Sequence, residues 1–457
     1  MDYRIEKDSM GEIKVPKDKY WGAQTQRSLE NFKIGNEKMP YFLIYTLGYL
    51  KLACARANRL LKPEKMTEEK LNIITMVVTE GFCENGLLKD NFPLSVWQTG
   101  SGTQTNMNVN EVIANFGNEI AKKRLLHPND DVNMSQSSND AFPTAMHITC
   151  VIEMNLLCKR LKELSDSFKR LEGKYKGIIK TGRTHLQDAT PISFSQEISG
   201  FTSTLKKDIE LLEVAKKPLL ELAIGGTAVG TGLNAPKGFD EAVCNELKLI
   251  FEESFKPAKN KFHALSSKDE IAFAHGAIKA VACDLMKIAN DIRWLSSGPR
   301  CGLSEITIPE NEPGSSIMPG KVNPTQCESL TMVCAQVMGN DTTIGICASQ
   351  GNFQLNVYMP VIIYNFVNST GLLCDAICSF EKNCVRGIKP KKEKMKENLD
   401  KSLMTVTALT PHIGYEKGAE VAKLAFKENI SLKEACLKLG YLTSEEFDKY
   451  YRFEEMI

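Results

Sequence analysis

The sequence has no excess of charge of either sign. It contains 57 lysines and arginines against 56 aspartates and glutamates in 457 residues. Without a surplus of one charge, there is no electrostatic basis for nucleic acid or an anionic membrane as the main partner. Local basic runs such as residues 389–396 are typical of solvated faces. We therefore expect neither nucleic acid nor a membrane surface to be the main partner.

Two further features are absent. The 14 cysteines include no Cys-x-x-Cys pair, and Cys374 and Cys378 repeat only at helical spacing. This argues against a zinc or iron–sulfur site and favours reduced thiols in a cytosol-like compartment. No run approaches the ~18 uninterrupted apolar residues of a membrane span, and residues 1–22 lack the apolar segment of a signal peptide. We expect a cytoplasmic protein with no metal and no membrane partner.

Long helical patterns dominate the middle of the chain. Apolar residues recur with helical periodicity over residues 141–175, 193–222, 268–297, 324–350 and 357–385. Helices of this length are roughly 40–50 Å long, which exceeds ordinary globular helices. Several are apolar on more than one face, as Ile271, Phe273 and Ala277 illustrate. One bundle covers only one stripe of each helix, so the pattern predicts a homo-oligomer.

The long helices divide the chain into three expected domains. Residues 1–135 read as a mixed and loop-rich domain with helices at 41–61 and 67–81, residues 136–387 as the long-helix domain, and residues 388–457 as a small helical domain. In the last, helices are expected at 415–427 and after Ser431, and Thr443 or Ser444 with Glu446 resembles a capping signal. The fold class is mainly α.

The stretch EPGSSIMPGKVNPTQCE at residues 312–328 is the most informative loop. Its prolines and glycines exclude a regular helix through Ser315 and Ser316. Asn323 is expected to cap the following helix and Pro324 to occupy its first position. A helix N-terminus beside Lys321 favours a bound anion. The phosphate-loop pattern fails in spacing and lacks its hydroxyl, so a small carboxylate suits the loop better, and an ordinary capping turn is the plain alternative.

Polar clusters recur elsewhere in the chain. WQTGSGTQTNMNVNE at 97–111 is typical of a solvated loop, but Ser101, Thr103, Asn106 and Asn108 would also suit a polar ligand. SSND at 137–140 precedes a helix, where capping alone would not require all four residues. GRTHLQDA at 182–189 carries a histidine, and GGTAVGTGLN at 225–234 reads as a tight turn and not a dinucleotide site. Neutral donors with one lysine, a histidine and a serine suit proton abstraction next to a carboxylate.

These motifs together identify a family resemblance. GSSIMPGKVNPTQCE, PKDKYWGAQTQRS, TGSGTQTNMNVNEV, HPNDDVN, SQSSND, GRTHLQDA and GGTAVGTGLN occur in the order found in the fumarase/aspartase superfamily. The sequence resembles the class II fumarate hydratases most. Aspartases tend to carry glutamine at the position of His185, alanine at that of Gly320 and threonine at that of Ser138.

The resemblance implies a fold, a reaction and a set of residues. The fold would be a homotetramer with a twenty-helix core, five long helices from each chain, and active sites built from three subunits. The reaction would be reversible anti addition of water to fumarate, giving L-malate, through a carbanion-like intermediate and with no cofactor. An aspartate ammonia-lyase and a catalytically silent helical oligomer are the alternatives. Aspartate turnover without malate turnover would indicate the first, and ligand binding without turnover the second.

The resemblance also implies a role for each motif residue. Ser315 would be the base, His185 would position or activate the water, and Glu328 would orient the histidine. Residues implied to bind the substrate carboxylates are Ser101, Thr103, Ser137, Ser138, Asn139, Thr184, Ser316, Lys321 and Asn323. Residues implied to form a second anion site are Arg124, His127, Asn129 and Asp130.

Overall fold

The computed structural model describes residues 2–82 and 86–457. Two compact units divide the chain. Unit 1 comprises Met1–Cys158, Glu210–Ala282 and Ala335–Leu373, and unit 2 comprises Lys159–Ile209, Cys283–Cys334 and Cys374–Ile457. The division into domains at 1–135, 136–387 and 388–457 stays a prediction.

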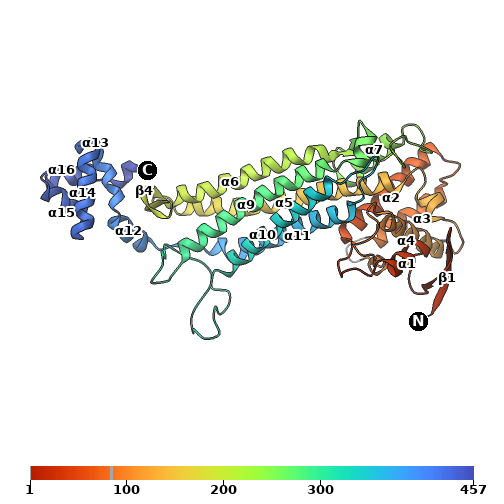
Figure 1. Cartoon of the computed structure of the whole chain (residues 1–457), viewed down its shortest axis with the longest axis horizontal. Coiled ribbons are helices and arrows are strands. Elements are labelled where there is room, and N and C mark those ends of the chain that lie inside the picture. Colours follow the sequence, from red (N-terminus) through yellow and green to blue (C-terminus); the bar gives the residue numbers. More distant parts are fainter. Residues whose placement is uncertain (1, 83–85) are drawn as a thin grey trace. The chain divides into compact units, whose positions relative to one another are not determined.

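The five expected long helices are present, so the mainly α fold class is confirmed. They are α5 (Ser138–Lys174), α6 (Phe194–Lys216), α9 (Asp269–Ser296), α10 (Thr325–Ala348) and α11 (Met359–Asn383). Figure 1 shows each as one continuous helix. Their ends lie within a few residues of the predicted ends, except that α6 ends earlier and is followed by a short 3-10 turn at Lys217–Leu220.

Polar and aromatic side-chain contacts join the long helices within each unit. In unit 1, His275 of α9 lies 2.9 Å from Asp341 of α10 and 2.9 Å from Ser369 of α11. In unit 2, Phe168 of α5 packs edge-on against Phe201 of α6, with ring centres 5.5 Å apart. Because these contacts are buried, they fix the rotation of each helix as well as its neighbours. The segments therefore pack as a bundle within each unit.

Shorter helices and a hairpin complete unit 1. They are β1 (Tyr3–Asp8) and β2 (Gly11–Pro16), which pair antiparallel, α1 (Ala23–Asn31), α2 (Tyr41–Leu61), α3 (Glu68–Gly81), α4 (Thr103–Ala121), α7 (Phe239–Phe251), α8 (Lys261–Ser266), and the short parallel pair β5 (Glu221–Leu222) and β6 (Lys256–Pro257). Glu111 of α4 joins α1 to this unit, since its carboxylate accepts hydrogen bonds from the Gly22 and Gln24 amides at 2.8 and 2.9 Å.

The prediction of a solvated loop at 97–111 is wrong. Residues from Thr103 onward form α4, and Thr105, Asn106, Asn108 and Asn110 are buried. Their side chains find buried partners, as when the Asn108 amide donates to the Asn91 carbonyl at 2.9 Å. A run of polar residues can enter a core when buried groups accept its amide hydrogens, and composition alone does not reveal this.

Unit 2 carries a second hairpin and a small helical region. Its further elements are β3 (Ile179–Thr184), β4 (Gln187–Ser193), β7 (Ile306–Thr307), β8 (Lys389–Pro390), α12 (Lys392–Lys401), α13 (Thr410–Ile413), α14 (Tyr415–Glu428), α15 (Leu432–Lys438) and α16 (Ser444–Tyr450). Capping boxes at Ser431 and Thr443 start α15 and α16, and the second confirms the predicted signal. Val421, Ala435 and Phe447 lie in the apolar core of these helices.

Among the residues that the structure describes, two helices are long and apolar enough to cross a membrane by length and composition. They span Ser138–Lys174 and Met359–Gly387, and 78% and 56% of their most apolar windows are buried inside the protein. Core helices of soluble proteins pass the same test. This burial is consistent with the bundle and gives no support to a membrane span.

Candidate active site

The serine loop before α10 is closed by its own hydrogen bonds. The Gly314 amide donates to the Lys321 carbonyl at 2.8 Å, and the Asn323 side chain donates to the Gly314 carbonyl at 2.7 Å. A Cβ at Gly314 would lie 2.7 Å from the Lys321 oxygen, so only glycine fits. Helix α10 begins at Thr325, and the Glu328 amide donates to the Pro324 carbonyl. Pro324 therefore holds the capping position, and not Asn323 as the sequence predicts. The Asn323 side-chain amide closes the loop instead.

Ser315 lies inside this closed loop. Its Oγ accepts hydrogen bonds from the backbone amides of Ile317 and Met318, at 3.3 and 3.1 Å. Both donors come from the turn that the loop closure holds together. Two amides directed at one hydroxyl oxygen would stabilise negative charge there. The geometry therefore suits a serine that gives up its proton.

A cavity of about 580 Å³ adjoins the loop within unit 2. Its lining includes Lys321, Asn323 and Glu328 from the predicted site, together with Arg293 and Trp294 of α9. The cavity thus brings together three of the residues named from the motif. Ser315 and Ser316 are not in its lining, although they belong to the same loop.

The histidine lies at the tip of the β3–β4 hairpin. Thr184 pairs with Gln187, and the two residues between them, His185 and Leu186, have φ angles of 56° and 61°. Positive φ at both central positions is the geometry of a tight hairpin turn. His185 is exposed there. The expected polar insertion between helices is therefore a rigid hairpin that presents Thr184 and His185 at its end.

A buried ionic cluster anchors this hairpin. Lys180 of β3 forms ion pairs with Glu197 at 2.9 Å and with Glu305 at 3.2 Å, and Arg183 pairs with Glu305 at 2.8 Å. Asn398 of α12 also donates to Glu305, at 3.0 Å. Burial would raise the pKa of Glu305, but the hydrogen bond from Arg183 and the charge of Lys180 hold it below its usual value. Glu305 is therefore ionised at neutral pH.

The remaining predicted ligands lie in unit 1. Ser101 Oγ and Thr103 Oγ1 are 2.8 Å apart at the start of α4. Ser138 begins α5, and its Oγ accepts a hydrogen bond from the Asn106 amide at 2.9 Å. Asn139 donates to the Ala228 carbonyl at 2.8 Å. The polar clusters at 101–106 and 137–139 are therefore adjacent.

Asp140 holds the Ser137–Asn139 segment in place through hydrogen bonds to backbone amides. Its buried carboxylate accepts hydrogen bonds from the amides of Ser137, Gly225 and Thr227, at 2.9, 3.0 and 2.8 Å. Burial raises the pKa of Asp140 to about 6, although these hydrogen bonds act in the opposite direction. The glycine-rich turn at 225–234 is thus joined to the serine segment, which confirms a tight turn near that segment.

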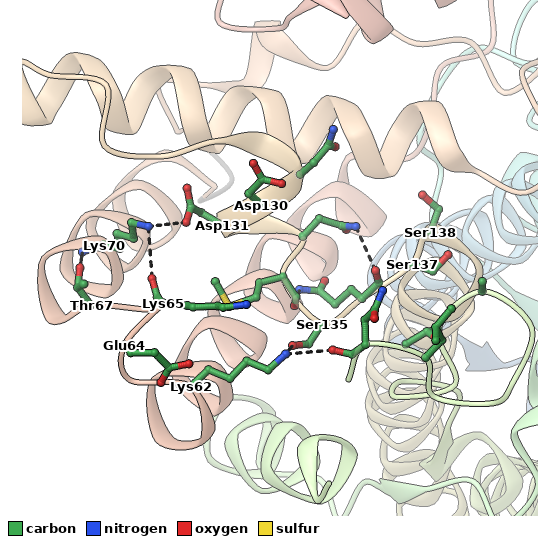
Figure 2. A pocket seen from close by; sticks show the side chains of 18 residues that line it. Lys62, Glu64, Lys65, Thr67, Lys70, Asp130, Asp131, Ser135, Ser137 and Ser138 are labelled. Carbon is green, nitrogen blue, oxygen red and sulfur yellow. Dashed lines mark hydrogen bonds and ion pairs between the residues drawn. The ribbon is translucent and has the colours of Figure 1, made fainter. Parts of the chain in front are cut away.

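A second cavity, of about 1020 Å³, opens beside this segment (Figure 2). Figure 2 shows Lys70 and Asp131 on one side and Ser137 and Ser138 on the other. Asn129 and Asp130, two of the four residues named for a second anion site, also line it, whereas His127 and Arg124 do not. His127 caps the turn at Pro128–Val132, since its Nδ1 accepts from the Asp130 amide at 3.2 Å.

Comparisons with known proteins agree with the motifs. The lyase family profile matches residues 11–339, and the profile for the fumarase C C-terminus matches residues 406–457. Proteins named class II fumarate hydratase from Oceanobacillus iheyensis and Helicobacter pylori are 56% and 58% identical over 100% of this chain and 99% of theirs. The chain belongs to the class II fumarate hydratase family. The resemblance inferred from the motifs is confirmed.

Solved structures support the same family. A crystal structure of recombinant class II fumarase from Schistosoma mansoni is 43% identical and covers 100% of this chain and 99% of its own, with a TM-score of 0.95. A fumarate lyase of Brucella melitensis, described as fumarate lyase:delta crystallin, is 38% identical at the same coverages, with a TM-score of 0.92. The class II fumarate hydratase fold therefore extends over the whole chain.

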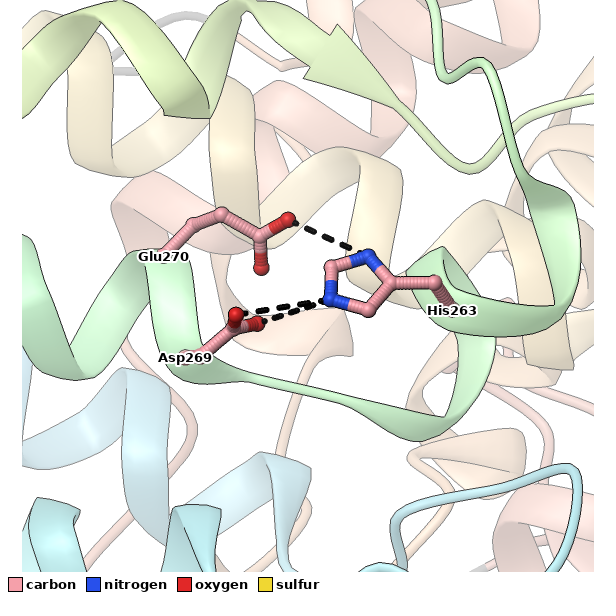
Figure 3. A group of neighbouring side chains, drawn as sticks. All are labelled: His263, Asp269 and Glu270. Atoms are coloured by element: carbon pink, nitrogen blue, oxygen red, sulfur yellow. Dashed lines mark hydrogen bonds and ion pairs between the residues drawn. The ribbon is translucent and has the colours of Figure 1, made fainter.

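Another cluster lies at the junction of α8 and α9. Figure 3 shows the His263 imidazole between the carboxylates of Asp269 and Glu270, with ion-pair distances of 3.3 and 3.6 Å. Among the described residues, this is the one group of three histidine, cysteine, aspartate or glutamate side chains whose ligand atoms lie within 4.8 Å of one another. Its members already pair with one another, so the junction is explained as a surface ion cluster.

Sequence reasoning missed the residues that support the site. Lys51 and Glu305 lie outside the motifs named for this family, and nothing in their local patterns marks them. Each is a polar side chain placed among helical or loop residues of ordinary composition. Only their burial and hydrogen-bond partners show that they hold the hairpin and the serine segment.

Proposed function

We propose that this chain catalyses the reversible hydration of fumarate to L-malate, by anti addition of water and without a cofactor. The observation that carries the proposal is the full-length match to several proteins named class II fumarate hydratase, at 56–58% identity. The geometry around Ser315 fits the chemistry, since its oxygen faces two backbone amides inside a closed loop.

Ser315 is assigned as the base in the direction from malate to fumarate. As an alkoxide, it takes the proton from C3, and the electrons of that C–H bond move into the adjacent carboxylate. The amides of Ile317 and Met318 stabilise the alkoxide before the transfer, and Lys321 adds positive charge in the same loop. The C2–O bond then breaks, and its electrons leave with the oxygen.

His185 is assigned to the water. In its protonated form, it gives a proton to the departing hydroxide, so water leaves and fumarate remains. Proton transfer from Ser315 back to the imidazole, through solvent, restores the starting state. Glu328 is assigned to orient and charge the histidine. In the hydration direction, each step runs in reverse, and His185 takes the proton of the attacking water.

Neutral donors, together with the cationic Lys321, bind the two carboxylates of the substrate. Hydroxyls and amides can direct hydrogens at carboxylate oxygens without adding a second negative charge. Assigned to this task are Ser101, Thr103, Ser137, Ser138, Asn139, Thr184, Ser316, Lys321 and Asn323. Arg124, His127, Asn129 and Asp130 are assigned to a separate anion site, of which Asn129 and Asp130 line the cavity of Figure 2.

The active unit is proposed to be a homotetramer in the cytoplasm, with each active site built from three subunits. The long helices leave apolar side chains exposed, including Phe273, Met332 and Ile346 at 54%, 67% and 59%. Faces of this kind are typical of subunit interfaces. Light scattering at micromolar concentration should give four times the chain mass of 50.9 kDa. A mass of one chain would contradict the assembly.

The proposed reaction is tested by following fumarate absorbance with purified protein. Fumarate should be consumed, and it should form from malate. Ser315→Ala should lower turnover by several powers of ten and leave the fold intact. The matched control is Ser431→Ala, since the Ser431 Oγ also accepts a backbone amide hydrogen bond, at 3.1 Å, but only to cap α15. That variant should lose about 1 kcal/mol of stability and keep its activity.

Three outcomes would contradict the assignment. A folded tetramer that turns over neither fumarate nor malate would reject the reaction. Ammonia release from aspartate without malate turnover would assign the chain to the other reaction of the superfamily. Equal activity of Ser315→Ala and the wild type would remove Ser315 from the role of base.

A further inference from the structure

Lys51 of α2 is a fully buried cation without a carboxylate partner. Its side chain is 0% exposed, and its Nζ donates to Asn133 Oδ1 at 3.0 Å and to Gln136 Oε1 at 2.8 Å. In the part of the chain that the structure describes, no carboxylate lies within ion-pair distance of it. The Asp140 carboxylate acts on it only by charge, without a direct ion pair, and burying an ammonium group without a paired carboxylate is unfavourable. Its position therefore requires an explanation beyond packing.

The ammonium group fixes the direction of the hydrogen bonds around it. Because it has donors only, Asn133 must present its side-chain oxygen to Lys51. That oxygen then also accepts from the amides of Asn106 and Asn110, each at 3.2 Å. The second hydrogen of the Asn106 amide goes to Ser138 Oγ, at 2.9 Å. Three hydrogen bonds thus connect Lys51 to Ser138, through Asn133 and Asn106.

The buried amide oxygens support this reading. Asn106 Oδ1 and Asn110 Oδ1 have no hydrogen-bond partner among the described residues. Turning either amide over would set its oxygen against the oxygen of Asn133, which Lys51 holds in place. Asn133 is held by Lys51 and by its own amide, which donates to the Gln136 carbonyl at 3.3 Å. Since unpaired buried acceptors are unfavourable, the arrangement depends in part on Lys51. The amide hydrogens of Asn106 and Asn110 therefore point toward Asn133, and the unpaired oxygens are the energetic cost of that orientation.

This network determines how the Ser138 hydroxyl forms hydrogen bonds. Its oxygen already accepts from Asn106, so its own hydrogen is free to donate. Ser138 is the first residue of α5 and lines the cavity of Figure 2, where a donor hydroxyl suits a carboxylate oxygen. We propose that Lys51 is a positioning residue, which acts through Asn133 and Asn106 to make Ser138 a donor to the substrate carboxylate. The inference rests on the proposed function.

Titration calorimetry with succinate, an unreactive four-carbon dicarboxylate, tests the inference on the full-length protein. Lys51→Met should weaken succinate binding about tenfold and raise KM similarly, while kcat changes less than threefold. The matched control is Lys268→Met. Lys268 is equally buried, but its ammonium group donates to the carbonyls of Ala264 and Leu265, at 2.9 and 3.2 Å, and to no substrate-facing side chain. Its loss should leave succinate affinity unchanged.

A double-variant cycle shows whether Lys51 acts through Ser138. Ser138→Ala should weaken succinate binding about tenfold, and adding Lys51→Met should change the affinity less than twofold further. If Lys51→Met does not fold, Asn106→Leu breaks the same series of hydrogen bonds one step closer to Ser138. Its affinity for succinate, which should also fall about tenfold, then decides the question.

Three results would overturn the inference. These are equal losses of succinate affinity in Lys51→Met and Lys268→Met, independent factors that multiply in the double variant, and unchanged affinity in Asn106→Leu. The proposed function fails separately. If the wild type binds succinate but does not hydrate fumarate, the reaction is rejected, and the calorimetric cycle still decides the role of Lys51.

Discussion

The buried carboxylate of Glu305 gives a prediction about the hairpin that carries the histidine. Glu305 is 0% exposed and pairs with Lys180 and Arg183, both on β3. Replacing it with glutamine keeps the shape but removes the charge that both cations face. Breaking a buried ion pair costs ~3–5 kcal/mol. Because Lys180 keeps Glu197 and the Arg183 side chain is 15% exposed, we expect the lower value, about 3 kcal/mol.

This loss should be visible in thermal unfolding. At ~2.1 cal/mol/K per residue, the entropy of unfolding for 457 residues is about 1 kcal/mol/K. A loss of about 3 kcal/mol therefore lowers Tm by about 3 °C. Fumarate hydration should fall as well, because Thr184 and His185 lie at the end of the strand that Glu305 anchors. Calorimetry and the absorbance assay measure the two effects on the same protein.

Glu397→Gln is the matched control. Glu397 also pairs with two lysines, Lys394 and Lys401, but on the exposed face of α12. Exposed pairs of this kind contribute little, so Tm and activity should stay at wild-type values. If Glu305→Gln leaves Tm and activity as unchanged as Glu397→Gln does, the buried cluster does not anchor the hairpin and the reasoning is refuted.

Two further predictions concern unit 1 and one helix of the bundle. In the folded state Asp140 keeps its proton up to about pH 6, whereas the unfolded chain releases it near pH 4. The free energy of unfolding should therefore fall by about 3 kcal/mol as the pH rises through that window. The Asp140→Asn variant should not show this fall. Denaturant titrations at several pH values measure the free energy of unfolding of both proteins, and the same pH dependence in both would contradict the role of Asp140. Gly100→Ala should prevent correct folding, because its Cβ would lie 1.5 Å from the Val357 oxygen. The control Gly200→Ala, in α6 with open space around it, should gain about 0.5–1 kcal/mol of stability in the same titration. A folded Gly100→Ala protein of wild-type stability would argue against the close approach of Gly100 to the Val357 carbonyl.

The long helices could be predicted because their signal is repeated many times. A helix such as α5 carries its apolar period over ten turns, and its ends at Ser138 and Lys174 lie close to the predicted 141 and 175. One ambiguous residue changes such a pattern little. The start of α10 depended on one residue, Asn323, and was missed by one position. The Asn323 oxygen could cap a helix and its NH2 group could close the loop, and only the geometry at Gly314 shows the loop closure.

The sequence predicted the motif residues of the site, but not the buried residues that hold them in place. Lys321, Asn323 and Glu328 do share one cavity, while the roles assigned to the motif residues stay predictions. The polar run that became α4 shows the limit. Its asparagines read as loop residues because propensity describes a chain in water, whereas in the protein their amides pair with buried groups from other segments. Those partners are distant in sequence, so no local pattern contains them.

Lys51 and Lys268 show why the supporting residues need the structure. Both are lysines in or beside helices, both are fully buried, and burial lowers the pKa of each to about 8. Lys268 gives its hydrogens to backbone carbonyls at the end of α8, which any sequence would offer. Lys51 gives its hydrogens to two side-chain amides, one of which leads to Ser138. The two lysines differ in the acceptors they meet, and it is this difference that separates a role in stability from a role in binding.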